Sequence, residues 1–599
     1  MRMRTGKAVV ALVVCALSAL GKAPAADFAS MAPEDAFAFI GVGHLGQFIE
    51  KWQETAYGKL WRDPEMAAFT RPGRQKAEEA LKTLSAEWAI DCPTLKRLFP
   101  GQVALWAEYL APYKPHEWGL VLVAERAEPP EQYRPLIDGA LKKWIPFETK
   151  NTQESAGGET VYAARWDTGE SLTAEQREEM GPSGQYTKHS ALWAFPEGLF
   201  ILAFDGDESI QRLLARVQQG ESCLAKHEGF RPMAESFTGP QFRLFLNIAS
   251  LAHYFRDDIF SLYSDAPKVD LETLGVSDLL DASYRVDLGE EALSIWGKVR
   301  VAENPRGIAR MLSAFCPLDQ SLLKASPAKP HALSITGYDL SAGLSALINA
   351  LRQGIPAAGA GWALAEGQVK NSTGLSLADE IIPAFGKQLL VFTAASSGQG
   401  AAPVPTFVVE LANSETVGRL IDALMAKPGA STAVEKTEFL GATIYALAAP
   451  MPSAPEAAGV SPPRPTLALT PRHLIFSLDG DLLRETIRRI SGKNPDNFLE
   501  SGAFGPPAPP EGRQLAGYSY QDTNLQAEYL LDALSQMQTA LALLAKPQGF
   551  RLDEYLDLSS KPQPETLKRY LGVTEGWSYV GSDGVSAAQS LPNEPVKPR

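Results

Sequence analysis

The chain has 599 residues, of which 45% are hydrophobic and 21% are charged, and its formal net charge is −14. This composition is typical of a soluble globular protein and excludes a collagen-like, low-complexity or disulfide-scaffold class. The negative balance argues against binding to nucleic acid or to an anionic membrane surface, because an acidic surface repels phosphate groups.

The first 25 residues predict a secretory signal peptide. A positively charged start precedes an apolar run over 8–20, which is too short to span a bilayer comfortably. Ala23-Pro24-Ala25 fits a cleavage signal that would leave Ala26 as the new N-terminus. No second apolar stretch of about 18 residues follows, so we expect no membrane span and an exported protein, periplasmic or extracellular.

Cysteine usage leaves the disulfide pattern open. Export would leave Cys92, Cys223 and Cys316. An odd number in an oxidising compartment allows at most one internal disulfide and one leftover thiol. Three buried, unpaired cysteines are an equally open interpretation. Cys15 follows Val14 rather than the small residue that a lipoprotein signal requires, which disfavours lipidation without settling it.

The first part of the chain predicts strands that alternate with amphipathic helices. Amphipathic helices are expected over 45–56 and, in the second part of the chain, over 344–351. Short turns such as 196–198 join neighbouring strands, and this requires antiparallel pairing because a parallel pair needs a long crossover. We therefore predict an α+β fold with a largely antiparallel sheet and helices packed on it. Strands are expected at 36–42, 102–109, 119–125, 189–194, 199–204, 241–247 and 332–337, with a hairpin over 283–301.

Residues 41–46, Gly-Val-Gly-His-Leu-Gly, have the spacing of a dinucleotide-binding fingerprint between a strand and a helix. However, no strand that ends in an acidic residue follows about 20 residues later, as the fingerprint requires. The corresponding turn in the second half of the chain, 337–341, lacks the pattern. We interpret the segment as a tight strand-to-helix turn and predict no cofactor.

An Asp-Gly-Asp triplet occurs at 205–207 and again at 479–481. Each triplet follows a strand-like apolar run and precedes a helical pattern. A calcium loop needs several more oxygen ligands at defined spacing. We expect the glycine to form a turn, and Asp207 and Asp481 to cap the helices that follow.

The triplet belongs to a longer internal repeat. Gly158-Glu-Thr-Val-Tyr162 matches Gly441-Ala-Thr-Ile-Tyr445, and copies differ in length across 166–188 and 449–465. Length changes belong in surface loops, which supports the alignment. Three segments are predicted: a signal peptide at 1–25, and tandem α+β copies of a layered domain at 26–325 and 326–599.

Potential catalytic and metal-binding residues do not indicate a specific activity. The seven histidines are scattered without a metal-ligand spacing, and no nucleophile motif is found, so no metal site or catalytic residue is predicted. Nine of the eleven tryptophans fall in the first copy. Large amphipathic rings stack on sugars or anchor partners. Trp52, Trp61 and Trp166 are our candidate ligand-binding residues.

Three segments near the start carry a resemblance: Met31-Ala-Pro-Glu-Asp-Ala-Phe-Ala-Phe-Ile40, Trp52-Gln-Glu-Thr-Ala-Tyr-Gly58 and Trp61-Arg-Asp-Pro64. They resemble a family of exported bacterial proteins of unknown function that is common in planctomycete-like lineages. The resemblance implies a strand soon after the signal peptide, then a helix, in an exported α+β protein. It implies no catalytic residues.

We expect a non-enzymatic binding or scaffolding module of the cell envelope, whose duplicated loops can vary independently. Its partner would be an envelope protein, a peptide or a glycan. The alternative is a periplasmic hydrolase that acts on peptide or glycan at a site between the two copies. Carboxylates with perturbed pKa values in one cleft would favour the enzyme, and an aromatic patch without them would favour binding.

Overall fold

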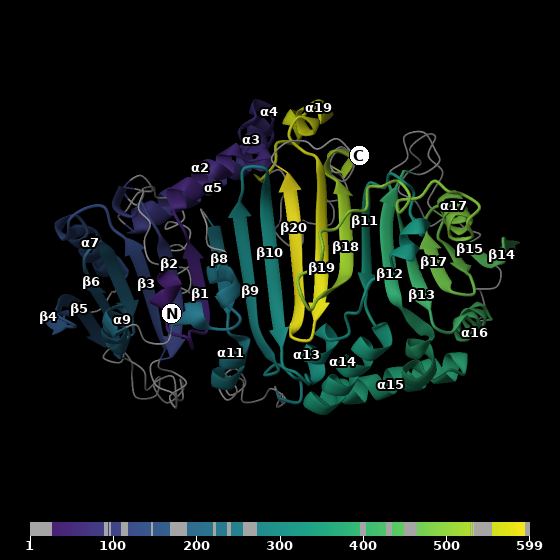
Figure 1. Cartoon of the computed structure of the whole chain (residues 1–599), viewed down its shortest axis with the longest axis horizontal. Helices are drawn as coiled ribbons and strands as arrows, with labels where there is room; N and C mark the ends of the chain where they lie inside the picture. The colour runs from purple at the N-terminus through teal and green to yellow at the C-terminus, as the bar shows by residue number, and fades with distance from the viewer. Residues whose placement is uncertain are drawn as a thin grey trace. The chain divides into compact units, whose positions relative to one another are not determined.

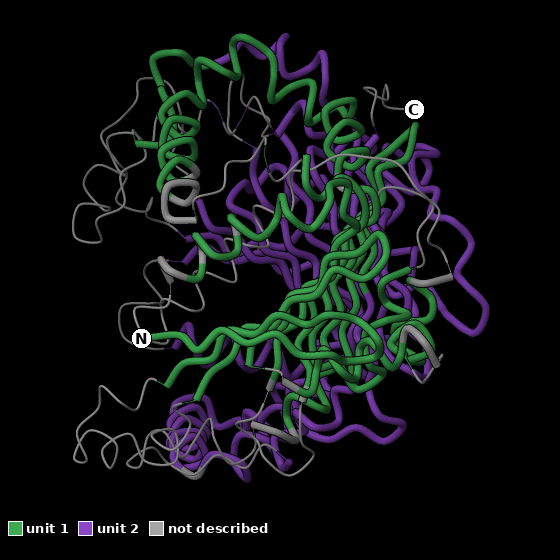
Figure 2. Tube along the Cα trace, turned by 90° about the vertical axis from the view of Figure 1, so that its left-hand side faces the viewer, with its two compact units in different colours: residues 1–261, 281–297, 545–561 green, residues 262–280, 298–544, 562–599 purple. Residues whose placement is uncertain are grey.

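The computed structural model divides the chain into two compact units that are interleaved in sequence. Unit 1 comprises 1–261, 281–297 and 545–561, and unit 2 comprises 262–280, 298–544 and 562–599 (Figure 2). The predicted signal peptide, Cys92 and most of the loops at 166–188 and 449–465 lie outside the described residues. The structure describes residues 27–88, 94, 97–109, 118–144, 148–167, 188–205, 207–219, 223–235, 241–255, 272–395, 403–426, 434–447, 464–526, 529, 531 and 554–592.

Unit 1 contains an antiparallel sheet with the order β4-β5-β6-β7-β3-β2-β1-β8-β9-β10. Of the β9–β10 hairpin, residues 281–297 belong to this unit. The strands are β1 (Ala38–Val42), β2 (Val103–Tyr109), β3 (Trp118–Glu125), β4 (Lys150–Ala156), β5 (Glu159–Asp167), β6 (Lys188–Ala194), β7 (Leu199–Phe204), β8 (Gln241–Leu246), β9 (Leu279–Leu288) and β10 (Ala292–Val301).

Helices cover both faces of the sheet in unit 1. Ile210 and Leu213 of α9 pack with Ile201 on one face, whereas Leu141 of α7 packs with Leu202 on the other. Alternate residues of one strand thus enter two different cores, as the two-residue period of a strand requires. The helices are α2 (Leu45–Glu54), α3 (Ala56–Arg62), α4 (Pro64–Phe69), α5 (Arg71–Trp88), α7 (Arg134–Trp144), α9 (Asp207–Gln219), α10 (Arg231–Glu235) and α11 (Ile248–Phe255).

Unit 2 contains an antiparallel sheet with the order β14-β15-β16-β17-β13-β12-β11-β18-β19-β20 (Figure 1). The strands are β11 (Ala332–Gly337), β12 (Phe385–Ala394), β13 (Val404–Leu411), β14 (Val434–Phe439), β15 (Ala442–Leu447), β16 (Thr466–Leu469), β17 (His473–Ser477), β18 (Gln514–Asp522), β19 (Val573–Gly581) and β20 (Gly584–Pro592).

Helices cover both faces of this sheet as well. Leu483 and Ile487 of α17 pack with Ile475 on one face, and Val417 and Ile421 of α16 pack on the other. Figure 1 shows α14 and α15 at one end of the strands of this unit. The helices are α13 (Gly307–Leu312), α14 (Leu340–Gly354), α15 (Pro356–Thr373), α16 (Ser414–Met425), α17 (Gly480–Ile490) and α19 (Pro564–Lys568), with short helical turns η6 (Gln320–Ala325), η7 (Leu377–Ile381) and η8 (Ile382–Ala384).

The predicted α+β class with a largely antiparallel sheet is confirmed. Among the described residues, no helix is both long and apolar enough to cross a membrane. Cys223 and Cys316 are free thiols. No group of three or more potential metal ligands occurs in the described part of the chain.

One sequence expectation about helix capping is wrong. In the second triplet the cap is Asp479, whose carboxylate accepts hydrogen bonds from the backbone N–H groups of Asp481 and Leu482 at 2.8 and 3.0 Å. Asp481 lies inside the first turn, because the helix begins at Gly480, two residues earlier than an Asp481 cap requires. In the first triplet, Asp205 is left-handed (φ 53°) and accepts a hydrogen bond from the backbone N–H of Ser190.

Candidate functional site

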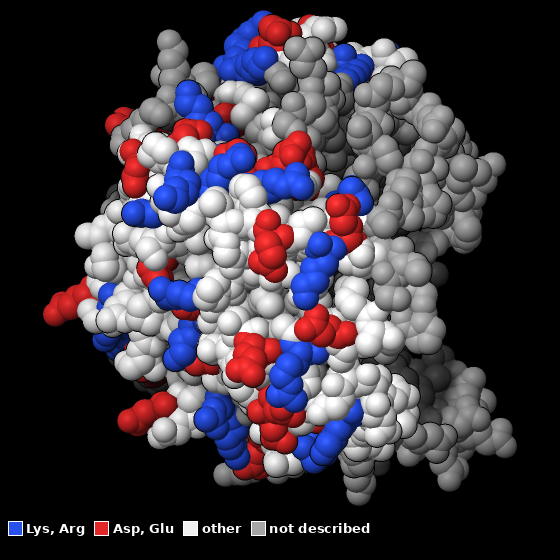
Figure 3. Space-filling view, turned by 90° about the vertical axis from the view of Figure 1, so that its right-hand side faces the viewer, with Lys and Arg blue, Asp and Glu red and all other residues white. Residues whose placement is uncertain are grey.

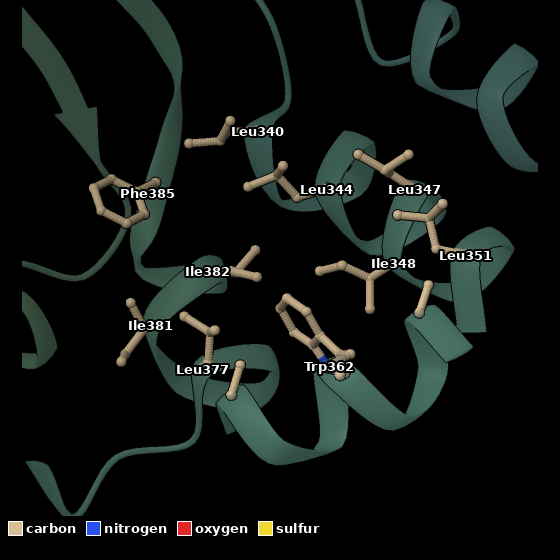
Figure 4. Close-up of a pocket in the computed structure, with 13 residues that line it drawn as sticks. Leu340, Leu344, Leu347, Ile348, Leu351, Trp362, Leu377, Ile381, Ile382 and Phe385 are labelled. Atoms are coloured by element: carbon tan, nitrogen blue, oxygen red, sulfur yellow. The ribbon is translucent and has the colours of Figure 1, made fainter. Parts of the chain in front are cut away.

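Unit 2 holds an apolar pocket of about 580 Å³ between α14, α15, the turns η7 and η8, and the start of β12. Its lining side chains come from aliphatic and aromatic residues, and they converge on one elongated space around Trp362 (Figure 4). The lining residues are Leu340, Leu344, Leu347, Ile348, Leu351, Ala358, Gly361, Trp362, Ala365, Leu377, Ile381, Ile382 and Phe385.

Large side chains on one wall of the pocket follow from the sequence of α14. Asp339 caps the helix by accepting a hydrogen bond from the backbone N–H of Ala342 at 2.9 Å. Leucine or isoleucine then recurs every three or four residues from Leu340 to Leu351, so these side chains share one face. At 1.5 Å per residue this stripe extends over about 16 Å. The pocket is therefore long rather than round.

Small residues on the opposite wall leave the space open. Ala358, Gly361 and Ala365 recur on one face of α15 and line the pocket there. A Cβ atom at Gly361 would meet no heavy atom within 4 Å. At Gly359, in contrast, a Cβ atom would lie 3.0 Å from the carbonyl oxygen of Arg352, so α15 approaches the end of α14 closely. The cavity forms because α14 and α15 are in contact near Gly359, while the residues of α15 that follow have side chains too small to fill the space between the two helices.

Hydrogen bonds to Glu366 of α15 hold η7 in place beside the pocket. The Glu366 carboxylate accepts hydrogen bonds from the Ser376 hydroxyl at 2.7 Å and from the backbone N–H groups of Leu377 and Ala378 at 2.9 and 3.2 Å. These bonds fix the start of η7, which places Leu377 and Ile381 against the cavity. The lining is thus supported by a hydrogen-bonded shell outside it.

Charged side chains adjoin the end of the pocket where Leu340 and Phe385 lie. The ammonium of Lys387 on β12 is 3.0 Å from the Asp339 carboxylate. Burial alone would raise the pKa of Asp339, but the Ala342 N–H and Lys387 outweigh it and hold that pKa below its ordinary value. The same hydrogen bond raises the pKa of Lys387. Both groups are therefore charged at neutral pH.

Cys316 lies beside this ion pair. Its Sγ is 3.8 Å from the carbonyl oxygen of Lys387. Burial is the largest cause of a raised pKa of the Cys316 thiol, and Asp339 and Glu410 add to it while Lys387 opposes it. The thiol therefore stays protonated at neutral pH, which is the unreactive form of cysteine.

The structure places the three predicted ligand-binding tryptophans on unit 1, on separate elements. Trp52 on α2 and Trp61 on α3 are 39% and 48% exposed. The guanidinium of Arg74 lies 4.2 Å from the centroid of the Trp61 ring, so one ring face is already covered. Trp166 on β5 is half-buried and stacks on the His189 ring at 5.7 Å.

These tryptophans lie on three different elements. Four strands separate β5 from β1, the strand that leads into α2. A ligand-facing role for each ring stays a prediction.

No sequence motif marks the residues that line the pocket. The stripe from Leu340 to Leu351 carries a helical period, and only part of it, 344–351, was expected to be helical. The signal that could have drawn attention to the site is the pairing of this stripe with the next segment. Residues 356–367 contain three glycines and five alanines, and such small side chains cannot fill the space that a leucine stripe faces.

Comparisons with known proteins give no relative. No protein-family model matches the sequence, and no curated protein or solved structure is significantly similar to it. The resemblance to exported bacterial proteins therefore stays a prediction.

Proposed function

We propose that the chain is an exported, non-enzymatic binding module, built from a duplicated α+β domain, whose second unit holds the hydrocarbon chain of an amphiphile. The apolar lining of the pocket carries this proposal. A cavity of about 580 Å³ falls within the range of small-molecule sites. Each buried CH₂ group would contribute about 0.8 kcal/mol to binding.

The shape of the pocket is compatible with a single linear hydrocarbon chain. The leucine and isoleucine side chains of α14 line the cavity along its length, and Trp362 lies between them and Leu377 (Figure 4). A flexible chain can follow this space and contact both walls.

The surface charge pattern is compatible with a ligand that is not a polyanion. On the described part of the face in Figure 3, basic and acidic side chains are interspersed. Exposed ion pairs such as Arg464–Glu435 and Arg484–Asp481 account for such a pattern. A nucleic-acid-binding surface would instead carry lysine and arginine side chains clustered on one face.

The proposed duplication is supported by strand order. Every strand of unit 1 has a counterpart in unit 2 whose label is ten higher, in the same order and with the same antiparallel neighbours. The registers agree as well. Val123 lies opposite Ile201, and Val408 lies opposite Ile475. Ile201 and Ile475 each precede their Asp-Gly-Asp triplet by four positions, so the same sequence positions pair in both units.

A shared close contact supports the same conclusion. A Cβ atom at Gly101 would meet the side chain of Glu125, and one at Gly386 would meet the side chain of Glu410. Gly101 lies two residues before β2, and Gly386 is the second residue of β12, the corresponding strand. Only a residue without a side chain fits beside the glutamate, so each copy keeps glycine for the same steric reason.

Matched glycine substitutions on α15 test the proposal. Gly361 lines the pocket and Gly367 does not, and a Cβ atom at either would meet nothing within 4 Å. Replacing a helical glycine removes a helix penalty of roughly 0.5–1 kcal/mol, so neither variant should unfold. Gly361→Phe places a ring in the groove and should weaken binding of the apolar probe N-phenyl-1-naphthylamine at least tenfold. Gly367→Phe should bind it as the wild type does.

The readout is the rise in probe fluorescence on titration with the full chain. Equal binding by Gly361→Phe and the wild type would contradict the proposal, because the probe would then lie elsewhere. Absence of binding to the wild type would contradict it as well.

A further inference from the structure

The pocket has an end at which the apolar lining meets charged groups. Leu340 and Phe385 belong to the lining, and their near neighbours Asp339 and Lys387 form the ion pair that joins α14 to β12. The Lys387 side chain is 63% exposed and the Asp339 side chain 26%. A chain that fills the groove would therefore bring its head group to this ion pair.

Charges at this end are balanced. Glu410 accepts a hydrogen bond from the backbone N–H of Lys387 at 3.0 Å, and its carboxylate lies 3.6 Å from the guanidinium of Arg472. Two carboxylates thus face two cations. Cys316 and His473 add no charge at neutral pH, because burial raises the pKa of the Cys316 thiol and burial, together with Arg472, lowers the pKa of His473.

Balanced charge disfavours a charged head group. A carboxylate placed here would be attracted by Lys387 but repelled by Asp339, and it would lose hydration on approach. A quaternary ammonium group would be attracted by Asp339 but repelled by Lys387. An uncharged hydroxyl group can accept a hydrogen bond from Lys387 and donate one to Asp339 without separating the pair.

We infer that the Asp339–Lys387 ion pair selects amphiphiles with one hydrocarbon chain and an uncharged, hydroxyl-bearing head group. This inference rests on the proposed function of the pocket. Specificity then comes from an unfavourable fit to charged competitors as much as from contacts to the favoured ligand.

Three probes with the same chain length test this inference: 1-monolauroylglycerol, dodecanoate and dodecyltrimethylammonium. Each is used below its critical micelle concentration to displace N-phenyl-1-naphthylamine from the full chain. The wild type should bind the glycerol ester about tenfold more tightly than either charged probe, the scale on which one like-charge contact alters affinity. Equal affinity for the three probes, or a preference for a charged one, would overturn the inference.

Two substitutions should shift the preference in opposite directions. Asp339→Asn leaves Lys387 unpaired and should improve dodecanoate binding about tenfold relative to the ester, and asparagine caps a helix as well as aspartate does. Lys387→Met leaves Asp339 unpaired and should improve binding of the ammonium probe instead. Lys387→Arg keeps the pair and should keep the wild-type order.

The outcomes separate this inference from the proposed function. If no probe displaces the fluorophore from the wild type, the pocket does not bind hydrocarbon chains and both proposals fail. If all three displace it and neither substitution changes their order, the pocket binds chains but the ion pair does not select the head group. An anion preference that survives Lys387→Met would place the head group at the opposite end, near Arg352, and would also overturn the inference.

Discussion

Glu108 and Arg216 form a buried ion pair in unit 1, with side chains 2% and 7% exposed. Their charged atoms lie 3.3 Å apart, and Glu108 also accepts a hydrogen bond from the indole N–H of Trp106 at 3.1 Å. The guanidinium of Arg216 donates a further bond to the carbonyl oxygen of Met31. The pair thereby ties β2 and α9 to the first described residues of the chain.

Removing the positive charge of Arg216 should lower the free energy of unfolding. Arg216→Met leaves the Glu108 carboxylate buried without a counter-charge, so we expect the free energy of unfolding to fall by about 3–5 kcal/mol. Urea denaturation of the full chain measures this loss. The double substitution Glu108→Gln with Arg216→Met should recover part of it, because no uncompensated charge remains. A loss below about 1 kcal/mol in the single variant would mean that water reaches Glu108.

A second buried arginine anchors the start of the described chain. The guanidinium of Arg243, which is fully buried, donates two hydrogen bonds to the Asp27 carboxylate at 2.7 and 2.6 Å. Phe28 and Ala29, which follow, are fully buried. Cleavage after Ala25, as the sequence predicts, would leave this anchor intact.

Among the elements, α17 gives the clearest test of a local sequence signal. Asp479 satisfies two backbone N–H groups at the helix start, whereas Asp481 makes an exposed ion pair with Arg484 at 3.1 Å. We expect Asp479→Ala to cost about 1 kcal/mol, the usual value of a helix cap, and Asp481→Ala to cost about 0.2–0.5 kcal/mol. Thermal unfolding of the two variants compares them. A larger loss for Asp481→Ala would show that the cap is assigned to the wrong aspartate.

Strands were more predictable than helices from this sequence. The segments 199–204 and 332–337 were expected at the bounds that the structure gives, because β-branched and aromatic runs there end at turn residues. Helix α14 extends beyond the expected 344–351 in both directions. Helix α15 was not expected, since its glycines lower helix propensity and its apolar residues follow no helical stripe.

The candidate pocket could not be predicted for a related reason. It is a space between two walls, and its volume depends on how closely α14 and α15 approach at Gly359. A sequence pattern gives the size of side chains on each helix, but the distance between the helices is set by tertiary packing. The ion pair of Asp339 and Lys387 likewise joins residues that are 48 positions apart in the chain.

At the scale of the whole molecule, strand order was also beyond single-sequence reasoning. β7 pairs with β3 as well as with β6, and β1 lies between β2 and β8. Such pairings join distant segments, and local periodicity contains no information on them. The strand orders of the two units match, but the duplication of the chain stays a prediction.

Native mass spectrometry of the full chain with 1-monolauroylglycerol tests the central claim most directly. We predict one adduct of the ester on each wild-type chain and on each Gly367→Phe chain, and none on Gly361→Phe, in which the new ring fills the groove. No adduct on the wild type, or the same adducts on all three proteins, would contradict a hydrocarbon-binding pocket between α14 and α15.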